Sequence, residues 1–430
     1  MYTLFSGGST IGEYDSQCGM YLIPSTIPGA GRGVVAGVNF SPLDSIEIVS
    51  TLSANTNIMD ACQLKNYGFS TGYDNYAMII FGPGNIYNHR DSQNIDRFWA
   101  YDDNRDVAYS TEPFADFNRI HYRVNSSILL GEEMFETYGP TWFSRFTNTT
   151  GTSDVTVSET DTVIREEQQP QPTRMDLEDL QQHGHCLTDV RIKQSHINGA
   201  GKGLFAMKDY LPGEVVTISP VLTLPKHIVD ESISDSVLMN YCYAISNSNI
   251  VLFPLNYGPL INYNTTTTAN VDIVWYDWNP SIQALSNKYN PESSNSSPSF
   301  IIQELSLEEK LNISLEELLS SSFAPLDIAY IATRYIEAGE EIYYNYGEQW
   351  EIAWNNYQSQ VLSWKHPNGP NKKLADKFSR RRGEYLSKST GSSKSSYNKP
   401  KFHHYISISD ELYPDHWKLS QNNNNKYNEL

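Results

Sequence analysis

Short apolar runs separated by Gly, Pro and Asn dominate the pattern of hydrophobic and polar positions along the chain. Three of these runs are typical of β-strands: Ala77–Phe81, Ile250–Phe253 and Asp327–Thr333. The long regular helices of a parallel α/β protein are missing from the pattern. The sequence therefore predicts a mainly β protein of small sheets with few short helices.

One stretch, from Leu305 to Ser320, has a helical pattern instead. Ser306 with Glu309, and Ser314 with Glu317, have the spacing of a capping box, in which a hydroxyl and a carboxylate satisfy free N–H groups at a helix start. We predict one or two short helices here.

Three segments occur twice in the same order. Ser25–Gly33 (STIPGAGRG) and Ser195–Gly203 (SHINGAGKG) share six of nine residues. Ile120–Trp142 aligns without a gap on Ile328–Trp350, with nine identities in 23 positions, where chance would give roughly one or two. Between these segments, each half has a Gly-Pro pair followed by an asparagine motif. The order predicts an internal duplication.

The duplication divides the chain into an N-terminal unit (residues 18–146) and a C-terminal unit (residues 183–360). Residues 147–182 read as a polar linker, and residues 361–430 as a tail that is first basic and then polar. Such segments bury too little apolar surface to offset the entropy of ordering. We therefore expect residues 147–182 and the chain beyond about Ser387 to lack fixed structure.

Composition narrows the class of protein. The chain of 430 residues is 39% hydrophobic, enough for two or three packed domains. It has neither a long apolar run nor a basic, apolar leader, so we expect no membrane span and no secretory signal. A soluble location in the cytoplasm or nucleus is favoured. Its four cysteines lie far apart without a CxxC pair, so no zinc cluster is expected.

Charge is distributed unevenly. Between Lys365 and Lys401, eleven Lys and Arg face two acids, so this segment carries +9 and the rest of the chain −19 − 9 = −28. An acidic body attracts cationic peptides and repels nucleic acid. The basic segment could contact nucleic acid or the acidic body, although a solvated tail is the favoured interpretation.

The repeated glycine segments invite two functional interpretations. A nucleotide-phosphate site requires a helix after the glycines, or a Gly-Lys-Ser/Thr motif. Apolar residues follow here instead, and Lys202 precedes Gly203. Glycines also let a backbone approach a flat, uncharged ligand, because no Cβ intrudes. An ordinary hairpin turn is the structural alternative.

Two further motifs carry polar groups suited to a ligand. Asparagines, which both donate and accept hydrogen bonds, suit a zwitterionic ligand or cap a loop; they are Asn88 and Asn94 in one unit, and Asn262 and Asn270 in the other. His89 follows Asn88 without a second His or Cys at metal-ligand spacing. Each unit ends in Gly-Glu-Glu and then a tyrosine before glycine, Tyr138 or Tyr346, whose hydroxyl is structural or catalytic.

In this order the motifs resemble the SET domain of protein lysine methyltransferases. The resemblance spans about Cys18–Phe146 and Cys186–Trp354. The C-terminal unit also resembles SET proteins of algae and related protists. The implied fold is the SET-type β-clip, with small sheets and a threaded C-terminal segment, present twice in tandem.

The resemblance also implies S-adenosyl-L-methionine as the cofactor and no metal. The implied cofactor-binding residues are the glycines, the asparagine and its follower in each unit: Gly31, Gly33, Asn88 and His89, then Gly201, Gly203, Asn262 and Tyr263. A substrate lysine would enter from the opposite side through an aromatic channel. Tyr138 and Tyr346 would place their hydroxyls near the reacting amine, as the catalytic residues.

Each unit departs from the family pattern at one position. The C-terminal unit has Tyr263 where the family has His. The N-terminal unit has Glu136 at the channel position where the family has Phe or Tyr, and where the C-terminal unit has Tyr344. A carboxylate there would hold an amine protonated, so the C-terminal unit is favoured as the active one. The cysteine-rich zinc segment that usually follows the domain is missing from both units.

These features predict a protein-lysine N-methyltransferase that acts on a basic, lysine-containing protein or peptide. The main alternative is a degenerate SET-like protein that holds a basic peptide or the cofactor without turnover. A third interpretation is a structural duplication, in which an inactive copy docks on an active one.

Overall fold

The computed structural model describes ten segments of the chain, and the account below concerns these alone: residues 17–27, 30–70, 76–99, 117–139, 173–197, 200–232, 237–289, 305–321, 323–365 and 402–419. The expected linker up to residue 172, and the basic segment from residue 366 to 401, lie outside them.

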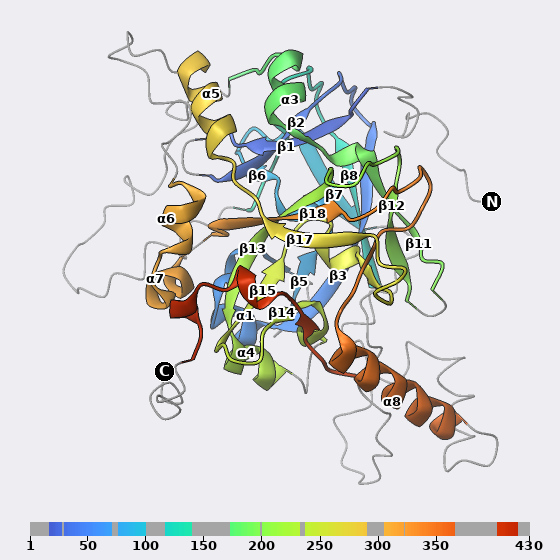
Figure 1. The fold of residues 1–430 in the computed structure, drawn as a ribbon. Helices are drawn as coiled ribbons and strands as arrows, with labels where there is room; N and C mark the ends of the chain where they lie inside the picture. The colour runs from blue at the N-terminus through green and yellow to red at the C-terminus, as the bar shows by residue number, and fades with distance from the viewer. Residues whose placement is uncertain are drawn as a thin grey trace, which may run out of the picture.

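Strands make up most of the N-terminal unit, together with the short helix α1 (Thr56–Asp60). Its strands are β1 (Met20–Pro24), β2 (Arg32–Ala36), β3 (Ser45–Asn55), β4 (Gly68–Ser70), β5 (Tyr76–Ile80), β6 (Asn88–His89), β7 (Ile95–Trp99), β8 (Phe117–Val124) and β9 (Phe135–Glu136). One sheet has the order β4-β5-β3-β8-β7, β1 pairs with β2, and β6 pairs with β9. This unit is the blue and cyan part of the ribbon (Figure 1).

The C-terminal unit combines strands with several helices. Its strands are β10 (His185–Cys186), β11 (Val190–Gln194), β12 (Lys202–Ala206), β13 (Val215–Pro225), β14 (Tyr243–Ala244), β15 (Ile250–Pro254), β16 (Asn262–Tyr263), β17 (Val271–Trp275), β18 (Leu326–Ala332) and β19 (Tyr343–Tyr344). Its helices are α4 (Lys226–Glu231), α5 (Asn279–Tyr289), α6 (Leu307–Leu311), α7 (Leu315–Ser320) and α8 (Glu348–Lys365). The main sheet has the order β17-β18-β13-β15-β14-β20, where β20 (Ile406–Ser407) comes from the C-terminal tail.

The two units repeat the same strand pairings. The hairpin β1–β2 pairs Met20 with Ala36, and β11–β12 pairs Val190 with Ala206, 170 residues later at both ends. Each unit also has one short parallel pair near its end, β6–β9 and β16–β19. The parallel pairs matter most for function because they bring the asparagine motif beside the strand that leads to Tyr138 or Tyr346.

The predicted strands and helices in the repeated regions are present. The three apolar runs form β5, β15 and β18. Strand β13 lies inside the main sheet between β18 and β15, and it is buried along almost its whole length. The capping box at Ser306 is complete with Glu309, and the Ser314 side chain accepts from the Glu317 N–H. The two predicted short helices are α6 and α7, at the left of Figure 1.

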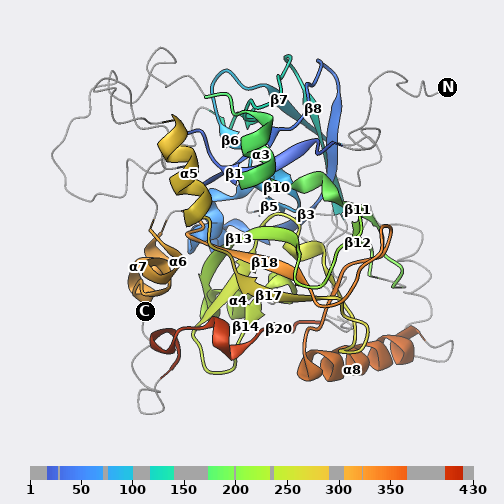
Figure 2. The ribbon, with the colours of Figure 1, turned by 45° about the horizontal axis from the view of Figure 1, so that its top comes forward.

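Two expectations of missing structure are wrong in part. Residues 173–182 of the expected linker are ordered: α3 (Leu177–His183) packs beside α5, and Met175 and Leu180 are buried. Lys288 of α5 forms ion pairs with Asp176 and Asp179, and the two helices lie side by side (Figure 2). Two apolar side chains and these charges are enough to dock a short helix.

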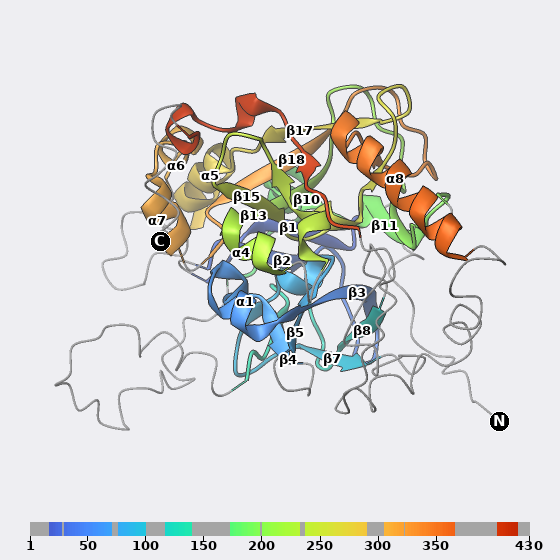
Figure 3. The same ribbon diagram turned by 90° about the horizontal axis from the view of Figure 1, so that it is seen from below.

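The tail is ordered where it was expected not to be. Residues 402–419, drawn in red in Figure 3, pack on the C-terminal unit, and β20 adds to β14 as a parallel strand (Figure 2). Its buried apolar side chains explain the docking: Phe402, Ile406, Ile408, Leu412, Tyr413 and Trp417. Burying even half of these large side chains gives several kcal/mol, at about 1.5–3 kcal/mol each.

The units contact one another extensively. Strand β10 extends the hairpin β1–β2, and a disulfide joins Cys18 to Cys186 at this edge. A buried ion pair links Arg32 to Asp327, with 2.7 Å between Nη2 and Oδ2. Among the described residues, no helix is long and apolar enough to cross a membrane.

Candidate functional site

The asparagine of each repeated motif is held by two acceptors of its own unit, a backbone carbonyl oxygen and a glutamate carboxylate. In the N-terminal unit, Asn88 Nδ2 lies 2.9 Å from the Arg32 carbonyl oxygen and 2.8 Å from Glu133 Oε1. Because both partners are acceptors, the amide nitrogen must face them. The Oδ1 atom of Asn88 takes part in no hydrogen bond that the structure describes, so it can accept one from a ligand.

The C-terminal unit repeats these two contacts. Asn262 Nδ2 lies 2.9 Å from the Lys202 carbonyl oxygen and 3.0 Å from Glu341 Oε1. The strand pairing explains why, since β16 runs parallel to β19, which begins two residues after Glu341. The sequence-predicted asparagines and Gly-x-Gly segments are thus adjacent within each unit.

Glu133 and Glu341 are the functional residues that the sequence analysis missed. The Glu341 side chain is fully buried and accepts from Ser195 Oγ at 2.7 Å and from the His196 N–H at 2.7 Å. Glu133 accepts in the same way from Ser25 Oγ at 2.8 Å and from the Thr26 N–H at 2.7 Å. Each carboxylate therefore ties the start of the glycine loop to the asparagine.

These carboxylates also explain one glycine in each loop. A Cβ atom at Gly33 would overlap the Glu133 carboxylate, and a Cβ atom at Gly203 would overlap that of Glu341. The requirement for glycine at these two positions thus comes from a buried glutamate. Burial raises the pKa of Glu133, although the hydrogen bonds from Thr26, Asn88 and Ser25 oppose that rise.

The preceding glycines have a conformational reason. Gly31 has φ +73° and Gly201 has φ +77°, values that residues with a side chain rarely adopt. Gly31 lines the cavity described below. The next residue, Arg32, forms an ion pair with Asp327 of the other unit.

The two tyrosines donate to equivalent backbone atoms. Tyr138 Oη lies 2.7 Å from the carbonyl oxygen of Tyr87, and Tyr346 Oη lies 2.5 Å from that of Ile261. Each acceptor is the residue before the fixed asparagine. Burial holds the pKa of both tyrosines well above the usual value, so both hydroxyls stay neutral. With its hydrogen donated to the Ile261 carbonyl, the Tyr346 oxygen keeps lone pairs that can accept a further hydrogen bond.

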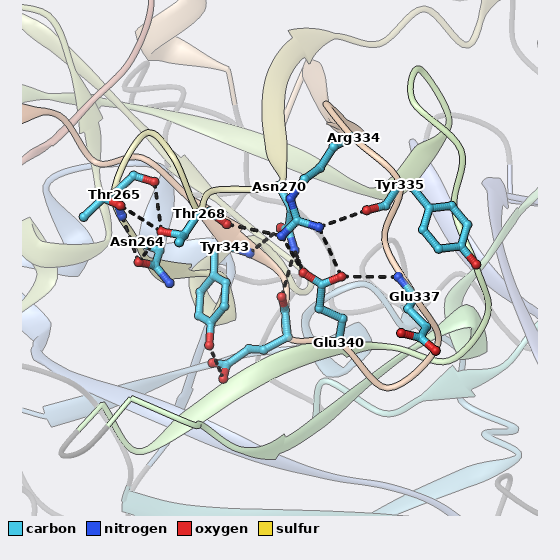
Figure 4. Close-up of polar contacts among 10 residues, drawn as sticks. Asn264, Thr265, Thr268, Asn270, Arg334, Tyr335, Glu337, Glu340 and Tyr343 are labelled. Carbon is cyan, nitrogen blue, oxygen red and sulfur yellow. Dashed lines mark hydrogen bonds and ion pairs between the residues drawn. The ribbon is translucent and has the colours of Figure 1, made fainter.

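A second pair of asparagines holds the strand that carries each tyrosine. Asn270 accepts from the Tyr343 N–H at 2.7 Å and donates to the Glu341 carbonyl oxygen at 2.9 Å. Its Nδ2 also lies 3.2 Å from Glu340 Oε1, and Glu340 pairs with Arg334 (Figure 4). Asn94 makes the corresponding bonds in the N-terminal unit, to the Phe135 N–H and the Glu133 carbonyl oxygen. These hydrogen bonds hold the segment that leads to the tyrosine in each unit.

A cavity of about 380 Å³ lies at the motifs of the N-terminal unit. Four of the predicted residues line it, Gly31, Asn88, His89 and Tyr138, whereas Gly33 and Glu136 do not. The C-terminal unit supplies part of the wall through Pro220, Leu255, Phe323 and Ala324. Its volume falls in the range of about 300–1,000 Å³ that is usual for small-molecule sites.

His89 is held in one tautomer at the rim of this cavity. Its Nδ1 accepts from the Tyr138 N–H at 3.0 Å, so Nε2 carries the hydrogen and faces Asp91 at 3.2 Å. Burial lowers the pKa of His89, so the ring is neutral at neutral pH. The ring centroid lies 5.3 Å from that of Tyr138.

Tyr263, which replaces this histidine in the C-terminal unit, belongs to an aromatic cluster. Its ring centroid lies 4.7 Å from Trp350 and 5.7 Å from Tyr346. Phe402 of the tail packs on Trp350 at 5.4 Å. Helix α8 and the tail thus surround the tyrosines with rings. Tyr344 donates to the Ser407 carbonyl oxygen at 3.2 Å.

Glu136, at the position that matches Tyr344, is paired within its own unit. The side chain of Glu136 is 2% exposed, and both of its oxygens lie 3.2 Å from Arg97 Nη1. The Arg97 guanidinium lies over the Phe69 ring at 4.2 Å. Burial raises the pKa of Glu136 to about 7, while the charge of Arg97 opposes the rise.

Comparison with known families identifies one of the two units. The family model for the SET domain matches residues 201–347. The chain contains a SET domain. Its matched range includes Gly201, Asn262, Glu341 and Tyr346, and no curated protein sequence matches the chain. Among the described residues, no group of three or more His, Cys, Asp or Glu could hold a metal ion.

Solved structures similar to this chain include a protein assigned as a histone methyltransferase and polycomb repressive complex 2. A Plasmodium falciparum protein assigned as a histone methyltransferase shares 21% identity over 30% of this chain and 98% of its own, with a TM-score of 0.23. Chaetomium thermophilum polycomb repressive complex 2, in an autoinhibited conformation bound to S-adenosylmethionine, shares 18% identity over 44% of this chain and 16% of its own, with a TM-score of 0.22.

Proposed function

We propose that the protein is an S-adenosylmethionine-dependent protein-lysine N-methyltransferase built from two SET units in tandem, and that the C-terminal unit transfers the methyl group. The observation that carries the proposal is the repeated arrangement of Asn262, Glu341 and Tyr346 within a matched SET domain. The same arrangement of Asn88, Glu133 and Tyr138 supports the tandem duplication.

The cofactor would be held by Gly201, Gly203, Asn262 and Tyr263 in the C-terminal unit. Asn262 fits the amino group of a zwitterion, because its Nδ2 is already used and its Oδ1 remains to accept. The backbone of Tyr263 would face the adenine. The corresponding residues of the N-terminal unit are Gly31, Gly33, Asn88 and His89. When bound, the cofactor supplies a methyl group on a sulfonium, which a neutral amine can take up.

Tyr346 is the proposed catalytic residue. Its hydrogen is donated to the Ile261 carbonyl oxygen, so its lone pairs can accept from the substrate amine and direct the nitrogen lone pair at the methyl group. Burial keeps the hydroxyl neutral, so it does not favour an ammonium as a phenolate would. The aromatic surroundings remove water from the amine and so lower its pKa, and the proton leaves to solvent before transfer.

Tyr344 would line the channel and limit the product. Its hydroxyl is held by the Ser407 carbonyl oxygen, and its ring centroid lies 5.9 Å from Tyr243 and 6.2 Å from Tyr346. A hydroxyl at this position narrows the space beside the amine. We therefore propose that the product is monomethyl-lysine, in a basic protein or peptide that the acidic body attracts.

The test is methyl transfer by the full chain. The purified protein is incubated with methyl-labelled S-adenosylmethionine and an array of lysine peptides, and mass spectrometry identifies the product. Transfer to lysine that is lost in Tyr346→Phe is expected, with Tyr335→Phe as the control because Tyr335 is 48% exposed. Cofactor binding without transfer to any lysine would favour the alternative of a binding protein.

A further inference from the structure

The cavity of the N-terminal unit has a substrate position that differs in chemistry from that of the C-terminal unit. The strand registers show which residues hold equivalent positions in the two units. Arg97 pairs with Tyr122 on β8, and Ile273 pairs with Tyr330, the equivalent tyrosine on β18. In the same way Phe69 pairs with Met78 on β5, while Tyr243 pairs with Leu252 on β15.

The positions therefore form two matching triads. The N-terminal unit has Phe69, Arg97 and Glu136, and the C-terminal unit has Tyr243, Ile273 and Tyr344. One triad is apolar and aromatic, as a channel for a neutral amine requires. The other contains an ion pair stacked on a ring.

Arg97 occupies its triad as a substrate cation would. About a third of the Arg97 side chain is exposed, whereas the Glu136 side chain is 2% exposed. The Arg97 side chain therefore enters from the surface, and its charged end contacts the buried carboxylate. The Phe69 ring covers one face of the guanidinium at 4.2 Å. A guanidinium paired with a carboxylate stays protonated and has no lone pair to attack a methyl group. It also repels a second cation at the same place.

The same cavity also has the features of a cofactor site. Gly31, Asn88, His89 and Tyr138 line its volume of about 380 Å³ together with Phe69 and Arg97, and Asn88 Oδ1 is an acceptor with no hydrogen bond among the described residues. We propose that the N-terminal unit binds an S-adenosyl nucleoside in this cavity without methyl transfer, because its own Arg97 occupies the place of the substrate amine. This inference rests on the proposed function, which gives that place its meaning.

A ligand in the cavity would also touch the C-terminal unit. Phe323 and Ala324 form part of the wall, and the Ala324 N–H donates to Tyr67 Oη at 3.1 Å. Binding would therefore stabilise the contact between the units, because the ligand binds only the state in which the two units are in contact.

The experiment measures how many ligands bind the full chain and where. S-Adenosylhomocysteine serves as the probe because it cannot donate a methyl group. Calorimetric titration should give two equivalents for the wild type and one equivalent for each of the matched variants Asn88→Leu and Asn262→Leu. Hydrogen exchange on the wild type, which does not depend on any variant folding, should show ligand protection at both residues 84–90 and residues 258–264.

The outcomes separate this inference from the proposed function. One equivalent, with protection confined to residues 258–264, would overturn the second site and leave the proposed function standing. No binding at all would overturn both. The Tyr346→Phe chain should still bind two equivalents, and its methyl transfer should fall at least 100-fold. Transfer that survives Tyr346→Phe and is lost when Tyr138→Phe is added would show that the N-terminal unit is catalytic and would overturn the inference.

Discussion

Replacing Glu341 by Gln tests whether the buried carboxylate organises the site. Glu341 accepts four hydrogen bonds, from Ser195 Oγ, Asn262 Nδ2, the His196 N–H and Tyr343 Oη, at 2.7, 3.0, 2.7 and 2.8 Å. Glutamine keeps the shape, but its NH2 group would face two of these donors. Hydrogen bonds to a charged group contribute about 1.5–3 kcal/mol each. Losing two costs about 3–6 kcal/mol, and the smaller desolvation of a neutral amide offsets part of it, which leaves about 3 kcal/mol.

The assay is the free energy of local opening, measured by native-state hydrogen exchange in residues 200–206 and 258–264, since two units need not unfold together. Glu133→Gln should weaken the N-terminal unit by a similar amount, because Glu133 also accepts four hydrogen bonds, three from equivalent groups and the fourth from Thr26 Oγ1. Glu340→Gln is the control: its pair with Arg334 is partly exposed, so the change should stay below about 1 kcal/mol. If Glu341→Gln were no more damaging than Glu340→Gln, the organising role would be refuted.

Three other outcomes follow from the structure. Tyr344→Phe should shift the product from monomethyl- toward di- or trimethyl-lysine by mass spectrometry, because it removes the hydroxyl held by Ser407; an unchanged product would contradict the channel assignment. Arg97→Leu should make the free energy of unfolding, measured in urea, fall more steeply between about pH 6 and pH 8. Burial raises the pKa of Glu136 to about 7, so the stability that is present below its unfolded pKa is lost as the pH rises through its folded pKa. Removing the opposing Arg97 charge raises the folded pKa of Glu136 further. The same slope in Arg97→Leu/Glu136→Gln would contradict this. Trp417→Ala should cost about 3–5 kcal/mol, since Trp417 is 1% exposed and anchors the tail; a loss below about 1 kcal/mol would show that the tail is not docked.

Local signals predicted the site residues that lie close together in sequence or repeat between the units. The capping serines and the strand patterns depend on near neighbours, so they could be recognised directly. The role of Glu133 and Glu341 could not, because each meets its serine partner more than 100 residues away. A signal existed all the same, since Gly-Glu-Glu is identical in both units.

The predictions for the linker and the tail were wrong for a different reason. Average composition suggested that the linker and tail were polar, yet a few apolar residues decide whether a segment docks. Met175 and Leu180 anchor α3, and Phe402, Ile406 and Trp417 anchor the tail, all nearly fully buried. The pairing of Arg97 with Glu136 could not be predicted either, because β7 and β9 belong to different sheets that come together only in the folded unit.

In the proposed function, the C-terminal unit is the methyl-transferring site. The most direct measurement is the lysine product formed from methyl-labelled S-adenosylmethionine by the full chain and by its Tyr346→Phe and Tyr138→Phe variants. We predict monomethyl-lysine from the wild type and at least a 100-fold loss in Tyr346→Phe that exceeds any loss in Tyr138→Phe. Transfer that depends on Tyr138 and survives Tyr346→Phe would contradict the account.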